Sequence, residues 1–185
     1  VQRYFGLFPP LSLTWVSAIA EQAGHETTII DARTLRLSKE DVLDRLKQWK
    51  PDMIGFMMTT YMFRETLSWA QYLKKHLKVP VVVGGYNLRV YPNESVSVNG
   101  VDFGCFNSAY HTVPRLLEEM EGGRHFEDVP GLIYKKNGQV HMTDYVEDPP
   151  FVPSGDPPVS ATSKRRWLES SRSSISASQQ PPLSS

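Results

Sequence analysis

The sequence predicts an α/β protein with a doubly wound parallel sheet, and three observations support this class. Helical and strand patterns alternate three times between Pro9-Pro10 and Gly84-Gly85, which is typical of a parallel sheet covered by helices. The run Met53–Met58 is almost wholly apolar, as expected for a strand buried on both faces. A glycine pair follows the third strand, at the edge where open parallel sheets bind ligands. We therefore expect a ligand beyond the carboxyl ends of the strands.

The first predicted elements are a helix, a short strand and a second helix. Apolar residues recur at helical spacing over 11–23, and Gly24 follows as a stop signal. The β-branched run Thr27–Ile30 predicts a short strand. Ser38, with Asp41 three residues later, predicts a capping box at the start of the second helix.

Two further strands flank a third helix. Met53–Met58 is the first of them and ends in the polar pair Thr59-Thr60. Apolar residues again recur at helical spacing from Phe63 to Leu77, which predicts the helix. The strand Val79–Val83 follows and leads directly into the glycine pair.

Shorter patterns predict the remaining elements. A long loop containing Pro92 leads to a strand at Val101–Phe106, and a helix over Val113–Met120 stops at Gly122-Gly123. Asn137-Gly138 then predicts a β-hairpin, because this pair supplies the positive backbone angles of a tight two-residue turn. The two strands of the hairpin are Gly131–Lys135 and Val140–Met142.

Composition limits the classes of function. The chain has 185 residues, 40% hydrophobic and 22% charged, which is enough for one well-buried domain. Twenty basic residues balance twenty acidic ones, so charge gives no case for nucleic-acid or membrane-surface binding. No apolar run approaches the roughly 20 residues that cross a bilayer, and there is no signal-peptide pattern. We expect a cytoplasmic protein, in which the single cysteine, Cys105, excludes an intrachain disulfide.

The chain changes character near Pro149. Residues 1–150 hold the periodic patterns, and we assign them to one domain. From Phe151 to Ser185, serine, proline and polar residues dominate without a sustained period. Such a segment buries too little apolar surface to offset an ordering cost of roughly 1–2 kcal/mol per residue. We therefore expect residues 151–185 to form a Ser/Pro-rich disordered tail.

Several short segments occur together in one known family. They are Pro9-Pro10-Leu11-Ser12-Leu13, Gln22-Ala23-Gly24-His25-Glu26, Ile30-Asp31-Ala32, Lys50-Pro51-Asp52-Met53-Ile54-Gly55, Val81-Val82-Val83-Gly84-Gly85 and Val129-Pro130-Gly131-Leu132-Ile133-Tyr134. In order and spacing, over roughly residues 5 to 150, they resemble the N-terminal cobalamin-binding domain of cobalamin-dependent radical SAM enzymes. The resemblance implies a flavodoxin-like (Rossmann-like) fold, with the corrin ring over the carboxyl edge of the sheet. It also implies a following domain that carries an iron–sulfur cluster and generates the radical.

Two features depart from that family. A four-iron cluster needs three neighbouring cysteine thiolates, and a chain with one cysteine cannot hold it. The Ser-rich segment begins where relatives continue into the catalytic domain, so it is either a terminated or frame-shifted end or a natural tail. Relatives also begin with a strand that is central in the order 2-1-3-4-5. Either Val1–Phe5 is a degraded form of this strand, or the strand has been lost.

The strand ends and the resemblance together indicate the cofactor-binding residues. Thr59-Thr60-Tyr61 follow a buried strand where relatives place hydroxyl residues around the nucleotide tail of the cofactor, although the threonines could instead cap the next helix. Gly84-Gly85 either lets the backbone approach a ligand or serves a turn that needs positive backbone angles. Tyr86 and Asn107 either contact the corrin edge or are ordinary loop residues. The candidates are Pro10, Leu11, Thr59, Thr60, Tyr61, Gly84, Gly85, Tyr86 and Asn107.

We predict no metal ligand and no catalytic group in this chain. The Asp-x-His-x-x-Gly motif, which supplies a histidine to cobalt in cobalamin proteins of the methionine-synthase type, is absent. His25 lies at a helix-to-strand junction, as a solvated loop histidine does. We therefore expect cobalamin without histidine ligation, no iron–sulfur cluster, and a Cys105 that packs as a small apolar residue.

Two functions of different classes follow. The leading hypothesis is a cobalamin-binding module of a radical SAM methyltransferase or cyclase-type protein, which binds the cofactor but does not catalyse by itself. Its partners would be cobalamin and a radical SAM catalytic domain or subunit. The alternative is a flavodoxin-like regulatory or protein-interaction domain that binds no corrin, because a fold alone does not separate the two.

Overall fold

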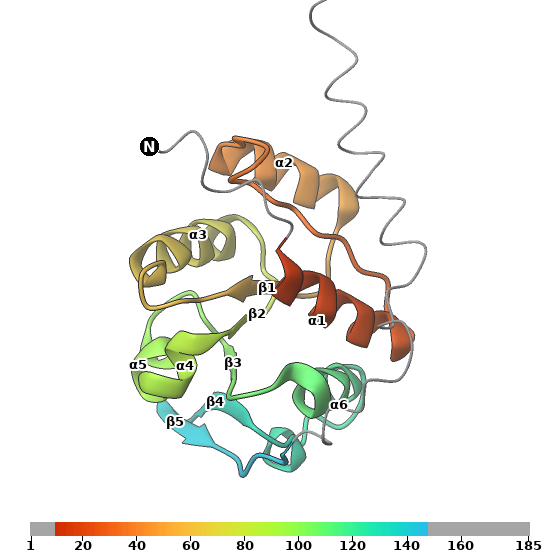
Figure 1. Cartoon of the computed structure of the whole chain (residues 1–185), viewed down its shortest axis with the longest axis vertical. Coiled ribbons are helices and arrows are strands. Elements are labelled where there is room, and N and C mark those ends of the chain that lie inside the picture. The colour runs from red at the N-terminus through yellow and green to blue at the C-terminus, as the bar shows by residue number, and fades with distance from the viewer. Residues whose placement is uncertain (1–9, 148–185) are drawn as a thin grey trace, which may run out of the picture.

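The described residues of the computed structural model, 10–147, form a five-stranded sheet with helices on both faces (Figure 1). The sheet order is β1-β2-β3-β4-β5, in which β1, β2 and β3 are parallel and the β4–β5 hairpin continues the sheet antiparallel to β3. The strands are β1 (Ile54–Met57), β2 (Val81–Gly84), β3 (Phe103–Cys105), β4 (Leu132–Lys136) and β5 (Gln139–Met142). The predicted α/β fold with a C-terminal hairpin is confirmed.

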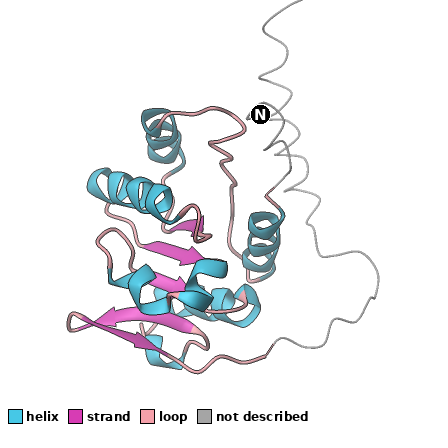
Figure 2. Cartoon of the chain, turned by 60° about the vertical axis from the view of Figure 1, so that its left-hand side comes forward, coloured by secondary structure: helices cyan, strands magenta, loops and turns pink. Residues whose placement is uncertain are grey.

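The helices cover the two faces of the sheet differently (Figure 2). They are α1 (Leu11–Gln22), α2 (Lys39–Trp49), α3 (Phe63–His76), α4 (Tyr86–Val90), α5 (Pro92–Ser97), α6 (Ala109–Glu121) and the 3₁₀ turn η1 (Phe126–Asp128). Side chains from α2, α3, α4 and α5 pack on Val81 and Val83, whereas α1 and α6 pack on Val82 and Cys105. The alternation of side chains along a strand sends these residues to opposite faces.

β1 is less buried than the sequence predicts. Ile54 and Met58 are buried on the α2–α3 face, but Gly55 is exposed on the other. The reason is that α1 packs beside α6 near β2 and β3, so among residues 10–147 no helix fully covers the corresponding face of β1. The expectation that Met53–Met58 is buried on both faces is therefore wrong for this position.

Local signals set several element boundaries as predicted. The Ser38 hydroxyl accepts a hydrogen bond from the Asp41 N–H at 3.1 Å, and the Asp41 carboxylate accepts one from the Ser38 N–H at 2.8 Å, which completes the capping box of α2. The hairpin turn has φ of 54° at Asn137 and 78° at Gly138, as a tight two-residue turn requires.

Two predicted elements are wrong. Thr27–Ile30 is not a strand, because an extended segment becomes one only when a neighbour pairs with it, and no described strand lies beside it. The predicted long loop around Pro92 is instead the helix pair α4 and α5. Pro92 occupies the first turn of α5, where a missing N–H costs nothing, and buried Asn87 and Ser95 join the two helices by a 2.7 Å side-chain hydrogen bond.

Two further predictions fall outside the described residues. They are the degraded or missing first strand at Val1–Phe5 and the disordered tail over 151–185. Among residues 10–147 there is no helix that is both long and apolar enough to span a bilayer.

Cys105 packs inside the sheet, as predicted for a small apolar residue. It is buried among Ile19, Ala20 and Val113, and burial raises the pKa of its thiol from 9.0 to about 12. The thiolate is the reactive form, so the folded protein presents an unreactive thiol at neutral pH.

We predict that a thiol reagent at pH 8 labels folded protein far more slowly than protein unfolded in guanidinium chloride, in which Cys105 reacts fully. The raised pKa also means that this thiol favours the folded state below pH 9.0, and that its contribution is lost as the pH rises toward about 12. Urea unfolding of wild type and Cys105→Ala across this range measures the effect. Equal labelling rates before and after unfolding would contradict the buried placement.

Candidate functional site

The carboxyl ends of the three parallel strands lie level with one another. Met57 pairs with Gly84, and Gly84 pairs with Cys105, so the loops that follow start from the same edge of the sheet. These loops carry most of the predicted site residues: Thr59, Thr60 and Tyr61 after β1, Gly85 and Tyr86 after β2, and Asn107 after β3. The topology therefore brings the predicted residues to one edge, as Figure 2 shows for the strands that carry them.

The first turn of α1 reaches the same edge. Ile19 and Ala20 of α1 pack on Val113 of α6, and the Nδ1 atom of His25, beyond the end of α1, lies 3.6 Å from the carboxylate of Glu121 at the end of α6. The two helices therefore run in the same direction, and α6 begins directly after β3. This places the start of α1, with the predicted residues Pro10 and Leu11, at the carboxyl edge.

Large apolar side chains at this edge are unusually exposed. Tyr61 is 96% exposed, Leu11 75% and Tyr86 74%, and each comes from a different element. Trp15 in the second turn of α1 and Tyr110 in the first turn of α6 add two half-exposed rings. A soluble protein rarely gathers such side chains without a binding role. Trp15 and Tyr110 were missed in the sequence, although the spacing of Leu11 and Trp15 puts both on one helical face.

The backbone between β1 and β2 explains Gly85. The Met58 N–H donates to the Gly84 carbonyl at 2.6 Å, and the Asn87 N–H donates to the Met58 carbonyl at 3.2 Å. Gly85 has φ of 114°, and a side chain on it would place its Cβ only 2.7 Å from the Met58 oxygen. The need for a positive backbone angle at a close contact therefore explains Gly85 by itself, because the fold requires glycine at this position.

Gly84 is different. Its φ lies outside the left-handed region, and an added Cβ would meet only the Cβ of Cys105, at an ordinary 3.8 Å. Neither the backbone nor the packing requires glycine at this position. The lack of a side chain leaves free space at the end of β2, on the face that carries Cys105.

Hydroxyl and amide groups line the loops. The Thr59 hydroxyl accepts a hydrogen bond from the Met62 N–H at 3.3 Å, so Thr59 helps to begin α3, although Met62 itself is the N-cap and has no side-chain cap. Thr60 is exposed. Asn107 is also exposed and has φ of 68°, a left-handed conformation that asparagine tolerates. Capping and ligand contact are compatible for these residues.

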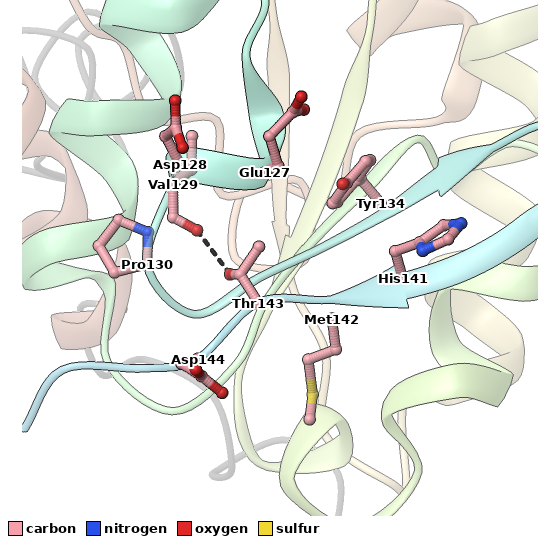
Figure 3. A pocket seen from close by; sticks show the side chains of 9 residues that line it. All are labelled: Glu127, Asp128, Val129, Pro130, Tyr134, His141, Met142, Thr143 and Asp144. Carbon is pink, nitrogen blue, oxygen red and sulfur yellow. Dashed lines mark hydrogen bonds between the residues drawn. The ribbon is translucent and has the colours of Figure 1, made fainter.

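A pocket of about 440 Å³ lies elsewhere, beside the hairpin (Figure 3). It is lined by Glu127, Asp128, Val129, Pro130, Tyr134, His141, Met142, Thr143 and Asp144. None of these is a predicted site residue. Within residues 10–147 there is no group of three or more His, Cys, Asp or Glu side chains placed to hold a metal ion. Also within residues 10–147, but outside the pocket, the buried Nε2 atom of His111 has no hydrogen-bond partner.

Comparisons with known proteins point to one family. The family model for the B12 binding domain matches residues 1–117. An uncharacterized methyltransferase of Pyrococcus horikoshii is 27% identical over 134 residues, which are 71% of this chain and 29% of the relative. The chain thus spans less than a third of the length of that relative.

Solved structures agree in fold. The radical S-adenosylmethionine methyltransferase TsrM from Kitasatospora setae, with tryptophan and a SAM analog bound, superposes with a TM-score of 0.65 at 18% identity, over 74% of this chain and 27% of TsrM. The cobalamin-dependent S-adenosylmethionine radical enzyme OxsB, with aqua-cobalamin and S-adenosylmethionine bound, has a TM-score of 0.66 at 16% identity, over 76% of this chain and 20% of OxsB. The β1–β5 arrangement is therefore the fold of a segment found in these larger enzymes.

The two glycines should respond differently to substitution. Gly85→Ala should lower the free energy of unfolding by about 1–3 kcal/mol, because alanine is strained at this φ and its Cβ meets the Met58 carbonyl. Gly84→Ala, the matched control, should change it by less than about 0.5 kcal/mol. Urea unfolding of both variants measures the difference. Equal loss of stability in the two would show that the Met58–Gly85 contact is not as described.

Proposed function

Because this chain belongs to the B12-binding domain family, we propose that it binds cobalamin over the carboxyl edge of β1, β2 and β3. The family match over residues 1–117 is the observation that carries the proposal, since this range contains all three parallel strands and the loops that follow them. TsrM with cobalamin bound, which has a TM-score of 0.63 to this chain, supports it.

The side chains at this edge suit a large, flat ligand with a polar rim. Leu11, Tyr61 and Tyr86 offer exposed apolar surface to the faces of a ring. Thr60 and Asn107 offer hydroxyl and amide groups to the amide substituents of a corrin. Gly84 leaves room for close approach. The cofactor, when bound, would supply the cobalt chemistry, and these residues would hold and orient it.

We propose further that no histidine of this chain ligates the cobalt. His25 is paired with Glu121 at the end of α1 opposite to Leu11, far from the proposed site. His111 lies in the first turn of α6 and is nearer, but its Nε2 is buried. The position of His25 and the burial of His111 Nε2 therefore support a site without histidine ligation.

The radical chemistry would belong to a partner domain or subunit. A four-iron cluster needs three neighbouring thiolates, and the one cysteine, Cys105, is buried and stays protonated at neutral pH. We propose that the segment binds cobalamin without catalysing by itself, and that a radical SAM domain or subunit acts on it. The alternative, a regulatory domain that binds no corrin, becomes the conclusion if binding is not found.

The first test is binding. After incubation with hydroxocobalamin and desalting, wild-type protein should retain the corrin absorption. Gly84→Val should weaken affinity by about 10- to 100-fold, because the branched side chain fills space that the ligand needs. Tyr86→Ala should weaken it by about five- to tenfold through loss of aromatic contact.

Trp49→Ala is the matched control, since Trp49 is an exposed aromatic residue at the end of α2 that leads into the opposite edge of the sheet. It should bind as wild type does. Wild-type protein that is folded but retains no corrin would overturn the proposed function and favour the regulatory alternative. Unchanged affinity in folded Gly84→Val would remove Gly84 from the site.

The second test concerns the cobalt. Electron paramagnetic resonance of the reduced cob(II)alamin complex should show the same nitrogen splitting, or the same lack of it, in wild type, His25→Ala and His111→Ala. The reason is that His25 lies at the far end of α1 from Leu11 and that the Nε2 atom of His111 is buried. A splitting that disappears in one of the two variants would identify that histidine as a ligand and contradict the proposal.

A further inference from the structure

The end of the β4–β5 hairpin fastens the segment Val129–Leu132. The Thr143 hydroxyl donates to the Val129 carbonyl at 2.6 Å, the contact dashed in Figure 3, and accepts from the Leu132 N–H at 2.9 Å. The backbone carbonyl of the next residue, Asp144, accepts a hydrogen bond from the Gly131 N–H at 2.9 Å. With the bond from the Thr143 N–H to the Leu132 carbonyl at 3.0 Å, four hydrogen bonds tie this segment to the two residues that follow β5.

The same segment fastens the loop after β3. The Gly131 carbonyl accepts a hydrogen bond from the Phe106 N–H at 2.8 Å, which holds the start of the loop. The Thr112 hydroxyl donates to the Pro130 carbonyl at 2.7 Å and lies 3.1 Å from the Ser108 carbonyl, which holds its end. The exposed Asn107 lies between these two fixed points.

We call the hydrogen bonds that join Thr143, the segment Val129–Leu132, Phe106 and Thr112 the clamp. Packing leaves this clamp little freedom. Thr112 is only 2% exposed, so the loss of its hydroxyl would leave the Pro130 carbonyl without that donor in a dry environment. Gly131 has φ of 65°, and an added Cβ would lie 3.1 Å from both the Phe106 oxygen and the Thr112 hydroxyl. We therefore expect the loop after β3 and the segment Val129–Leu132 to move as one unit.

We infer that the hairpin sets the position of Asn107 for the ligand, through the hydroxyls of Thr143 and Thr112. Neither threonine belongs to the ligand-contacting set, so both are positioning residues. The inference rests on the proposed function, and it extends the site to a part of the chain that begins twelve residues beyond the family match at residue 117.

Threonine-to-valine variants test this, because valine is close to threonine in shape and lacks the hydroxyl. Thr112→Val and Thr143→Val should each bind cobalamin about tenfold more weakly, since the first loses the hydrogen bond to Pro130 and the second those to Val129 and Leu132. The amide of Phe106 should also exchange with solvent about tenfold faster in the ligand-free protein. Thr112→Ser keeps the hydroxyl and should restore both properties.

Thr27→Val is the matched control. The Thr27 hydroxyl also makes two side-chain hydrogen bonds, with Ser17 at 2.5 Å and Glu21 at 2.8 Å, but toward the far end of α1. The Thr27→Val variant should have a lower free energy of unfolding, but its affinity for cobalamin and the hydrogen exchange of the Phe106 amide should equal those of wild type. If Thr112→Val does not fold, Thr143→Val and Thr112→Ser carry the test.

The outcomes separate the inference from the proposed function. If wild type binds no cobalamin, the proposed function fails, and the exchange of Phe106 alone decides whether the hairpin positions the loop. Wild-type affinity and exchange in both valine variants would overturn the inference. So would an equal loss of affinity in Thr27→Val, because the effect would then follow stability and not the clamp.

Discussion

The arrangement of the carboxyl edge depends on the backbone contact between Met58 and Gly85. Met58 is fully buried, its amide groups bond to both Gly84 and Asn87, and glycine at position 85 lets the two loops approach. The Asn87 side chain adds a contact to the Met58 sulfur at 3.5 Å and a hydrogen bond to Ser95. The loops after β1 and β2 are thereby locked into one unit, from which Tyr61 and Tyr86 project into solvent.

At the opposite edge of the sheet, charged side chains bind one another and the backbone. Asp102 pairs with Lys74 and accepts a hydrogen bond from the Val81 N–H at 2.8 Å, which ties the starts of β2 and β3 together. Lys135 donates to the carbonyls of Val98 and Val101 at 2.8 and 3.0 Å. Polar groups there satisfy one another, whereas the carboxyl edge leaves rings and amides facing outward. This difference is one reason why we place the proposed ligand at the carboxyl edge.

Local chemistry made much of the fold predictable, and long-range contacts account for the rest. The capping box at Ser38 and the Asn137-Gly138 turn depend on residues within a few positions, so the sequence reveals them. The predicted strand at Thr27–Ile30 needed a pairing partner, and α4 and α5 depend on the buried Asn87–Ser95 hydrogen bond. Neither interaction can be predicted from the local sequence pattern. The glycine pair predicts where a ligand would lie, but only the structure separates Gly85, where the backbone needs glycine, from Gly84, where it does not. The role of Thr112 depends on Pro130, eighteen residues away, and was not foreseeable.

The hairpin has two ends with opposite constraints. Its base is bound through Thr143 to the segment that holds the Asn107 loop, while at its tip an added Cβ on Gly138 would meet nothing within 4 Å. The tip therefore has open space around it, although its two residues keep the positive φ angles that the turn requires, whereas the base is held in place. In protein engineering the same asymmetry makes the Asn137-Gly138 tip a suitable place to insert a peptide tag or attach a dye, since changes there leave the geometry of the distant sheet edge intact.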